Sequence, residues 1–305
     1  MERRDIIIGE GTEFPLKGIL SLPDDSSSPV PAVVMVHGSG ASNMDERVMK
    51  LTPFKDLADG LARHGIASIR YDKRTFAHAR KMKNCEVTVK SETIDDAVLA
   101  ANLLRQTPEI DSSRIFILGH SMGAMLAPRI DSEGADARGL ILMAGTPHRL
   151  EDIVVRQLKQ AGGKGLLKLI VSLEYKIFAK KFDGLYEMSD DEAKSKKFAG
   201  GTNLYYFKEM GQKTADDYLL ESTKPALIMQ GGKDFQVLAE DDFAEFKKLL
   251  AGRENTEFRL YPDLNHCFVD AIYNDILKAS KEYSTERHIG EEVISDIADF
   301  IIRNC

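Results

Sequence analysis

Short apolar runs recur along the chain, and several are followed by a segment whose apolar residues have helical spacing. In residues 53–64, Phe54, Leu57 and Leu61 fall on one face of a helix. A continuous apolar run such as Ala32–Val36 is typical of a strand buried on both faces. This alternation predicts a doubly wound α/β sheet, mostly parallel and flanked by helices. The runs expected to form its strands are Ala32–Val36, Ile66–Tyr71, Ile115–Leu118, Gly139–Ala144, Pro225–Gln230 and Phe258–Tyr261.

The two ends of the chain add to this predicted core. Residues Asp5–Gly9 and Leu16–Leu22 have the pattern of a hairpin, which we expect at one edge of the sheet. Apolar residues between Ile289 and Ile301 define a C-terminal helix that packs back on the sheet. In the interior, a Thr-x-x-Asp pattern at residues 93–96 predicts a capping box that opens a helix, and residues 76–90 are expected to form an irregular loop.

The composition changes after the fourth expected strand. Residues 146–222 are rich in charge and helical patterning and are interrupted by glycines, which indicates a helical cap inserted into a core formed by residues 1–145 and 223–305. We expect the apolar residues of the cap to form mainly its own core, with some of them walling a pocket. The apolar stripe consists of Leu166, Leu169, Ile170, Leu173 and Ile177, and the aromatic cluster of candidate substrate-binding residues is Tyr205, Tyr206 and Phe207.

The sequence Gly-His-Ser-Met-Gly at residues 119–123 has the form of a nucleophile elbow. An apolar strand leads into it and a helical segment follows, which is the context that a Gly-x-Ser-x-Gly motif requires. Glycines are needed at both ends because a side chain there would collide with the neighbouring strand or helix. The pattern predicts that Ser121 is a nucleophile lifted clear of the sheet, and that His120 is a buried, hydrogen-bonded scaffold residue.

Partners for Ser121 follow two later strands. A serine hydroxyl needs a base to accept its proton and an acid to orient that base, and we assign these roles to His266 and Asp234. The chain order Ser–Asp–His is that of α/β hydrolases. Asp263 is an alternative acid, although it lies on the same loop as His266 and would have to fold back.

A second glycine-rich turn, His-Gly-Ser-Gly at residues 37–40, follows the first buried strand. Such a turn can direct a backbone N–H toward the space above the sheet. We expect the backbone N–H groups of Ser39 and Met122 to form an oxyanion hole. His37 is expected to pin the loop, and Asp72 and Arg74 to brace it through ion pairs.

Charge and cysteine content narrow the function classes. The 305 residues carry a formal net charge of −7 with a pI near 5.6, which offers no basic face for nucleic acid or an anionic membrane. Three scattered cysteines fit reduced thiols, and the seven histidines lack metal-ligand spacing. We therefore expect a cytoplasmic enzyme that needs no metal or organic cofactor and acts on a small molecule. The oligomeric state stays open, a homodimer being one of the alternatives.

Taken together, these motifs resemble the α/β-hydrolase superfamily, and more narrowly the bacterial serine esterases related to dienelactone-hydrolase-like and cinnamoyl (feruloyl) esterase proteins. The resemblance covers essentially the whole chain. It implies an α/β-hydrolase fold with Ser121, Asp234 and His266 as catalytic residues and with carboxylic esters of short or aromatic acyl groups as substrates. True dienelactone hydrolases use a cysteine nucleophile, so Ser121 argues against that activity.

Two other function classes remain open at this stage. A peptidase or amidase of the same fold would need acidic residues to bind a free N-terminus or a large additional domain, and neither is evident from the sequence. A non-catalytic ligand-binding relative could keep the fold, because fold alone does not determine function. Retention of all three candidate catalytic groups argues against it.

Overall fold

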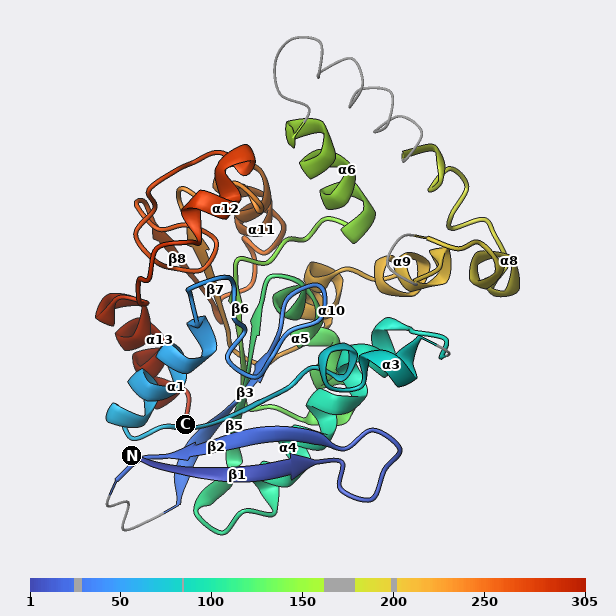
Figure 1. The fold of residues 1–305 in the computed structure, drawn as a ribbon. Coiled ribbons are helices and arrows are strands. Elements are labelled where there is room, and N and C mark those ends of the chain that lie inside the picture. Colours follow the sequence, from blue (N-terminus) through green and yellow to red (C-terminus); the bar gives the residue numbers. More distant parts are fainter. Residues whose placement is uncertain (25–28, 84, 162–178, 199–201) are drawn as a thin grey trace.

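The computed structural model describes residues 1–24, 29–83, 85–161, 179–198 and 202–305. A single sheet crosses the molecule in the strand order β1-β2-β4-β3-β5-β6-β7-β8 (Figure 1). The two N-terminal strands pair antiparallel at one edge, and the others run parallel. The strands are β1 (Glu2–Ile8), β2 (Leu16–Leu22), β3 (Val30–Val36), β4 (Ala67–Tyr71), β5 (Ile110–His120), β6 (Gly139–Met143), β7 (Ala226–Gly231) and β8 (Thr256–Tyr261). The predicted sheet, hairpin and strand sequence are confirmed.

Helices cover both faces of the sheet because its central strands are apolar on both sides. In β3, Val34 packs into one core layer, and Val33 and Met35 pack into the other. The first layer also receives residues of α4, α5, α10 and α11, and the second those of α1 and α13. The helices are α1 (Pro53–Arg63), α2 (Arg74–Ala77), α3 (Ala79–Met82), α4 (Asp95–Arg105), α5 (Met122–Ile130), α6 (Leu150–Ala161), α8 (Asp190–Ser195), α9 (Leu204–Gly211), α10 (Ala215–Glu221), α11 (Ala244–Leu249), α12 (Ala279–Glu282) and α13 (Glu291–Arg303).

The start of α4 differs from the sequence prediction. A π-helical turn over Lys90–Ile94 precedes α4, so that Thr93 lies inside helical backbone and does not cap it. The capping exchange lies upstream, where the Thr88 amide donates to Ser91 Oγ and the Ser91 amide donates to Thr88 Oγ1, each at 3.0 Å. The expected loop over residues 76–90 is also partly wrong, because α2 and α3 occupy its first half.

Part of the segment expected to form the cap lies above the carboxyl ends of the strands, whereas α10, which also belongs to this segment, packs against α5 on the sheet. Figure 1 shows α6 over this end of the sheet and α8 and α9 to one side of it. The apolar stripe at residues 166–177 lies outside the described residues. Within the described ranges, no helix is long and apolar enough to cross a membrane.

Candidate active site

Ser121 stands on the sharp turn between β5 and α5. Its backbone has φ 55° and ψ −118°, a conformation that residues other than glycine rarely adopt, and its amide donates to Met143 O at 2.9 Å. A Cβ on Gly119 would lie 2.1 Å from Gly123 O, and a Cβ on Gly123 would lie 2.1 Å from Val36 O. Both glycines are therefore required by close backbone contacts, as the sequence predicted.

Asp234 contacts His266 directly. Its Oδ2 lies 2.7 Å from His266 Nδ1, and its Oδ1 accepts from the amides of Gln236 and Val237 at 2.7 and 3.0 Å. The carboxylate is almost fully buried, and Gln230 Nε2 donates to it at 3.0 Å. Asp263, the alternative acid, is exposed and pairs with Lys233 instead.

The contact with Asp234 leaves Nε2 of His266 free to accept a proton. Ser121 and His266 line the same cavity, of about 330 Å³. Among the described residues there is no hydrogen bond between Ser121 Oγ and His266. Such contacts are often long before substrate binds.

Two backbone amides border the same cavity. Ser39 follows β3 and Met122 begins α5, and the described structure gives neither amide a protein acceptor. A Cβ on Gly38 would come within 3.1 Å of Ser121 Cβ, so the loop after β3 approaches the elbow closely. The geometry thus offers two N–H donors beside the serine.

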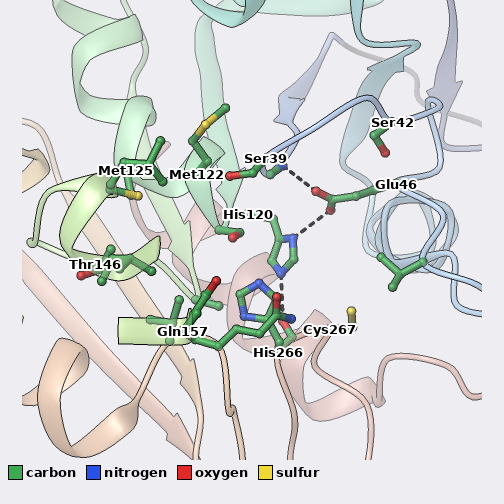
Figure 2. Close-up of a pocket in the computed structure, with 18 of the residues that line it drawn as sticks. Ser39, Ser42, Glu46, His120, Met122, Met125, Thr146, Gln157, His266 and Cys267 are labelled. Carbon is green, nitrogen blue, oxygen red and sulfur yellow. Dashed lines mark hydrogen bonds and ion pairs between the residues drawn. The ribbon is translucent and has the colours of Figure 1, made fainter. Parts of the chain in front are cut away.

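His120, which precedes Ser121 in the chain, forms a buried ion pair with Glu46. Glu46 Oε2 is 3.0 Å from His120 Nδ1, and His120 Nε2 lies 2.8 Å from the carbonyl oxygen of His266 (Figure 2). Burial lowers the pKa of His120, but the charge and hydrogen bond of Glu46, the His266 carbonyl and the charge of Asp234 together outweigh burial and raise this pKa above its ordinary value. His120 is therefore a buried scaffold residue, as predicted, whereas sequence reasoning missed Glu46. No local pattern marked it.

The loop predictions around the site are confirmed for His37 and Arg74, whereas Asp72 braces the loop through a backbone hydrogen bond and not through an ion pair. His37 Nε2 lies 3.0 Å from Asn43 O, and burial lowers the pKa of His37 to about 4. Asp72 accepts from the Met44 amide at 2.8 Å, while Arg74 pairs with Asp96. The contacts of His37 and Asp72 hold the loop that carries Ser39, and the pair of Arg74 with Asp96 joins α2 to α4.

A second, more apolar cavity of about 540 Å³ adjoins the first. The two cavities share Ser39, Ala41, Met122, Leu150 and Val154, but only the first is lined by Ser121 and His266. Leu150 and Val154 belong to α6, so this helix roofs the boundary between the cavities.

The three aromatic candidates of the cap do not behave alike. Tyr206 and Phe207 line the second cavity, and the Tyr206 hydroxyl donates to Glu92 Oε2 at 2.6 Å. Tyr205 lines neither cavity. The Lys194 ammonium lies over its ring, 4.7 Å from the ring centre.

Asp242 lies in the first turn of the π-helical segment Ala239–Phe243 and also contacts more distant parts of the chain. It is completely buried, where its Oδ1 accepts from Thr146 Oγ1 at 2.7 Å and its Oδ2 pairs with Arg156 of α6. Oδ2 also accepts from the Leu238 amide at 2.6 Å. Asp242 therefore ties α6 to the core.

Cys267 is another reactive side chain near the site, and its surroundings suit a structural role. Cys267 is buried beside His266, and burial raises the pKa of its thiol well above the ordinary value, which fits a packing role. Over the described ranges, no group of three or more His, Cys, Asp or Glu side chains is arranged to hold a metal ion.

The parallel sheet with a serine elbow, and with an acid and a histidine after its last two strands, defines an α/β hydrolase. Residues 27–270 match the Hydrolase_4 family, described as serine aminopeptidase, S33. The esterase EstD of Thermotoga maritima is 32% identical over 302 residues, which span 99% of this chain and 68% of that protein. The chain therefore belongs to the Hydrolase_4 family.

Solved structures agree with this fold. Est1E from Butyrivibrio proteoclasticus, in a structure with ferulic acid bound, has a TM-score of 0.62 at 16% identity, with 98% of each chain covered. A Pyrococcus furiosus esterase has a TM-score of 0.57 at 18% identity, with 99% of this chain and 91% of that chain covered. The Pyrococcus horikoshii acylaminoacyl peptidase has a TM-score of 0.59 at 12% identity, with 99% of this chain and 41% of that chain covered.

Proposed function

We propose that this protein is a serine carboxylesterase. The observation that carries the proposal is the 2.7 Å contact of Asp234 with His266, in a cavity that also contains Ser121 on its strained turn. The esterase EstD, which matches almost the whole chain, supports ester hydrolysis as the reaction.

In the proposed mechanism, Ser121 Oγ attacks the ester carbonyl while His266 Nε2 takes its proton. The carboxylate of Asp234 stabilises the imidazolium that forms, and the amides of Ser39 and Met122 donate to the oxyanion. His266 then protonates the departing alcohol, which leaves an acyl-enzyme on Ser121. Water activated by His266 attacks the acyl-enzyme, and the carboxylic acid departs.

The two cavities suit the two halves of an ester. Because His266 must protonate the leaving alcohol, the alcohol belongs on the side of the cavity that His266 lines. The second cavity adjoins Ser39 and Met122 but not His266, so we assign the acyl group to it. Its volume and apolar walls suit a short or aromatic acyl group, and Est1E binds ferulic acid.

The cap completes this picture of the substrate site. We propose that residues 146–222 are an insertion between the core residues 1–145 and 223–305, that its helices α6 and α9 form the lid, and that Tyr206 and Phe207 contact the acyl group. Tyr205 would act on substrate only indirectly. A cytoplasmic location is supported by the absence of a disulfide among Cys85, Cys267 and Cys305.

The family description also raises aminopeptidase activity, which would require a carboxylate to receive the substrate ammonium. Two carboxylates line the cavities over the described residues, and both already have partners. Glu46 pairs with His120, and Glu92 accepts from Thr75 and Tyr206. Ester hydrolysis is therefore the better-supported function.

The test compares p-nitrophenyl acetate, butyrate and octanoate, a p-nitrophenyl cinnamate and an aminoacyl p-nitroanilide as substrates. We expect the wild type to hydrolyse the short and aromatic esters and to leave the anilide essentially intact. Ser121→Ala should abolish turnover, and Asp234→Asn should lower kcat by about 10⁴-fold because the imidazole loses its orienting carboxylate. Asp263→Asn is the matched control and should keep wild-type rates.

Two results would contradict the proposal in different ways. Faster cleavage of the anilide than of every ester would favour the peptidase. A folded wild type that neither hydrolyses the esters nor reacts with a fluorophosphonate would favour a non-catalytic ligand-binding protein.

A further inference from the structure

Gly38 occupies a crowded position that favours glycine, but glycine alone would not hold one conformation there. A Cβ here would lie 3.1 Å from Ser121 Cβ and 3.3 Å from Glu46 Oε1. Glycine removes this crowding, yet its backbone is the most flexible of any residue. The neighbouring amide of Ser39 is a candidate oxyanion donor, so the loop needs an external restraint.

Two buried charged side chains contact Gly38, one at its amide and the other at its carbonyl oxygen. The Gly38 amide donates to Glu46 Oε1 at 2.6 Å, and Lys73 Nζ donates to the Gly38 carbonyl oxygen at 3.0 Å. Lys73 is 2% exposed and Glu46 is 5% exposed. Hydrogen bonds to charged groups are shorter and stronger than those between neutral groups.

The contact with Lys73 also determines the direction of the Ser39 amide. The Gly38 carbonyl and the Ser39 N–H belong to one planar trans peptide, so they point in opposite directions. Lys73 lines neither cavity, whereas Ser39 lines both. With the carbonyl held by Lys73, the N–H faces away from that ammonium.

Neither charge is left unpaired. Glu46 faces His120 at 3.0 Å, and Lys73 faces Glu92 at 3.6 Å. Buried ion pairs are costly to desolvate, and apolar replacements are often as stable. Overall stability is therefore a poor explanation for burying four charged groups around one glycine.

We propose that Lys73 and Glu46 are positioning residues that hold Gly38 from both sides and aim the Ser39 N–H at the oxyanion. The inference rests on the proposed esterase function. It assigns no contact with the substrate to Lys73.

The experiment uses Lys73→Met, which keeps the unbranched side chain to within one atom of its length and removes the donor. An oxyanion donor acts mainly in the transition state, so kcat for p-nitrophenyl butyrate should fall about 10- to 100-fold with KM changed less than about twofold. Affinity for an aryl trifluoromethyl ketone, whose hemiketal with Ser121 carries an oxyanion, should fall in proportion, as measured by ¹⁹F NMR and inhibition. Glu46→Gln, which keeps an acceptor for the Gly38 amide, should lose less than Lys73→Met.

Lys224→Met is the matched control, because Lys224 pairs with Asp131 and Asp136 near the start of β7, at the opposite end of that strand from the site. It should retain wild-type kcat and inhibitor affinity. If Lys73→Met does not fold, the double variant Lys73→Met/Glu92→Gln removes both charges of the pair and should show the same loss of kcat.

The outcomes separate the two proposals. An active wild type together with a Lys73 variant that keeps kcat and ketone affinity within twofold overturns the positioning role alone. A loss confined to KM or to thermal stability overturns it as well. A wild type that neither turns over esters nor forms the ketone adduct overturns the esterase proposal, and the positioning role with it.

Discussion

The histidines next to the site show how a partner decides the charge of a buried residue. His37 and His120 are both buried, yet burial lowers the pKa of His37 to about 4, whereas the pKa of His120 is raised. The difference lies in the ion pair with Glu46, 3.0 Å from His120. Both nitrogens of the His120 ring face oxygen atoms, of Glu46 and of the His266 carbonyl, which favours the imidazolium.

This ion pair predicts a pH-dependent loss of stability in Glu46→Gln. The raised pKa of His120 contributes stability below about pH 6.5, which is lost as the pH rises through the folded-state pKa. The lowered pKa of Glu46 contributes stability above about pH 4.3, which is lost as the pH falls. The substitution should therefore lower the free energy of unfolding most between these values, by about 3–5 kcal/mol.

Urea unfolding at pH 5.5 and at pH 9 measures this difference. We expect the loss of unfolding free energy in Glu46→Gln to be smaller at pH 9, because His120 loses its proton more readily there. Glu291→Gln is the control, since Glu291 pairs with His64 at 2.8 Å on the surface and should contribute less than about 1 kcal/mol. A loss of equal size at both pH values would contradict the assignment of a charged His120.

At the scale of secondary structure, the elbow depends on how closely β3, β5 and α5 approach one another. Gly123 touches the backbone of β3, where Val36 O would lie 2.1 Å from an added Cβ. Backbone atoms cannot move aside as the end of a side chain can. The strand–turn–helix unit therefore tolerates no side chain at this position.

Gly123→Ala should consequently destabilise the fold by more than about 3 kcal/mol, at the upper end of the range for single substitutions. Equilibrium unfolding in urea tests this. Gly252→Ala provides the comparison, because nothing lies within 4 Å of an added Cβ there and its φ is not positive. Similar stabilities of the two variants would show that the elbow can relax.

Polar contacts help to attach helix α6 to the core. Arg156 pairs with the buried Asp242, and Gln157 Nε2 donates to Gln236 O at 3.1 Å. These contacts place Leu150 and Val154 over both cavities. The position of the roof thus depends on a few polar side chains.

Arg156→Gln should weaken substrate binding by loosening this roof. We expect KM for p-nitrophenyl butyrate to rise several-fold with a smaller change in kcat, because Arg156 lines neither cavity and the Asp234–His266 contact is untouched. Steady-state kinetics, with Arg63→Gln at a surface ion pair of α1 as control, measure the effect. A fall in kcat with unchanged KM would instead show that Arg156 acts on the chemical step and would contradict a role in substrate binding.

At the scale of the whole molecule, the two cavities lie between helices and loops that are far apart in the sequence. Residues of α6 and α9 close cavities whose floor is formed by the loops after β3 and β5. Substrate selection is thereby separated from the reacting groups.

Truncation of one residue in each cavity should change different specificities. Phe207→Ala enlarges the proposed acyl cavity and should shift the preferred acyl chain from butyrate toward octanoate by about tenfold in relative kcat/KM. Ile153→Ala enlarges the proposed alcohol cavity and should instead improve turnover of butyrates with bulkier alcohols. The reverse pattern would exchange the assignment of the two cavities.

Sequence pattern determined most of the fold. Apolar runs buried on both faces marked the parallel strands, and helical spacing marked α1 and α13, because these periodicities reflect which positions face the core. Glycines flanking Ser121 indicated the tight turn, and chain order pointed to Asp234 and His266. These are local signals. They left Asp263 open as an alternative acid, and the structure places Asp234 against His266 and Asp263 against Lys233.

Tertiary structure alone decided which charged residues are buried and what they contact. Glu46, Lys73 and Asp242 look like ordinary surface charges in the sequence, yet each is buried against partners from other segments. Ion pairs have no sequence period, and their energies depend on distance and on the loss of water, which only the folded chain defines. For the same reason, the sequence predicted that a pocket exists, but not its two volumes or the residues that divide it.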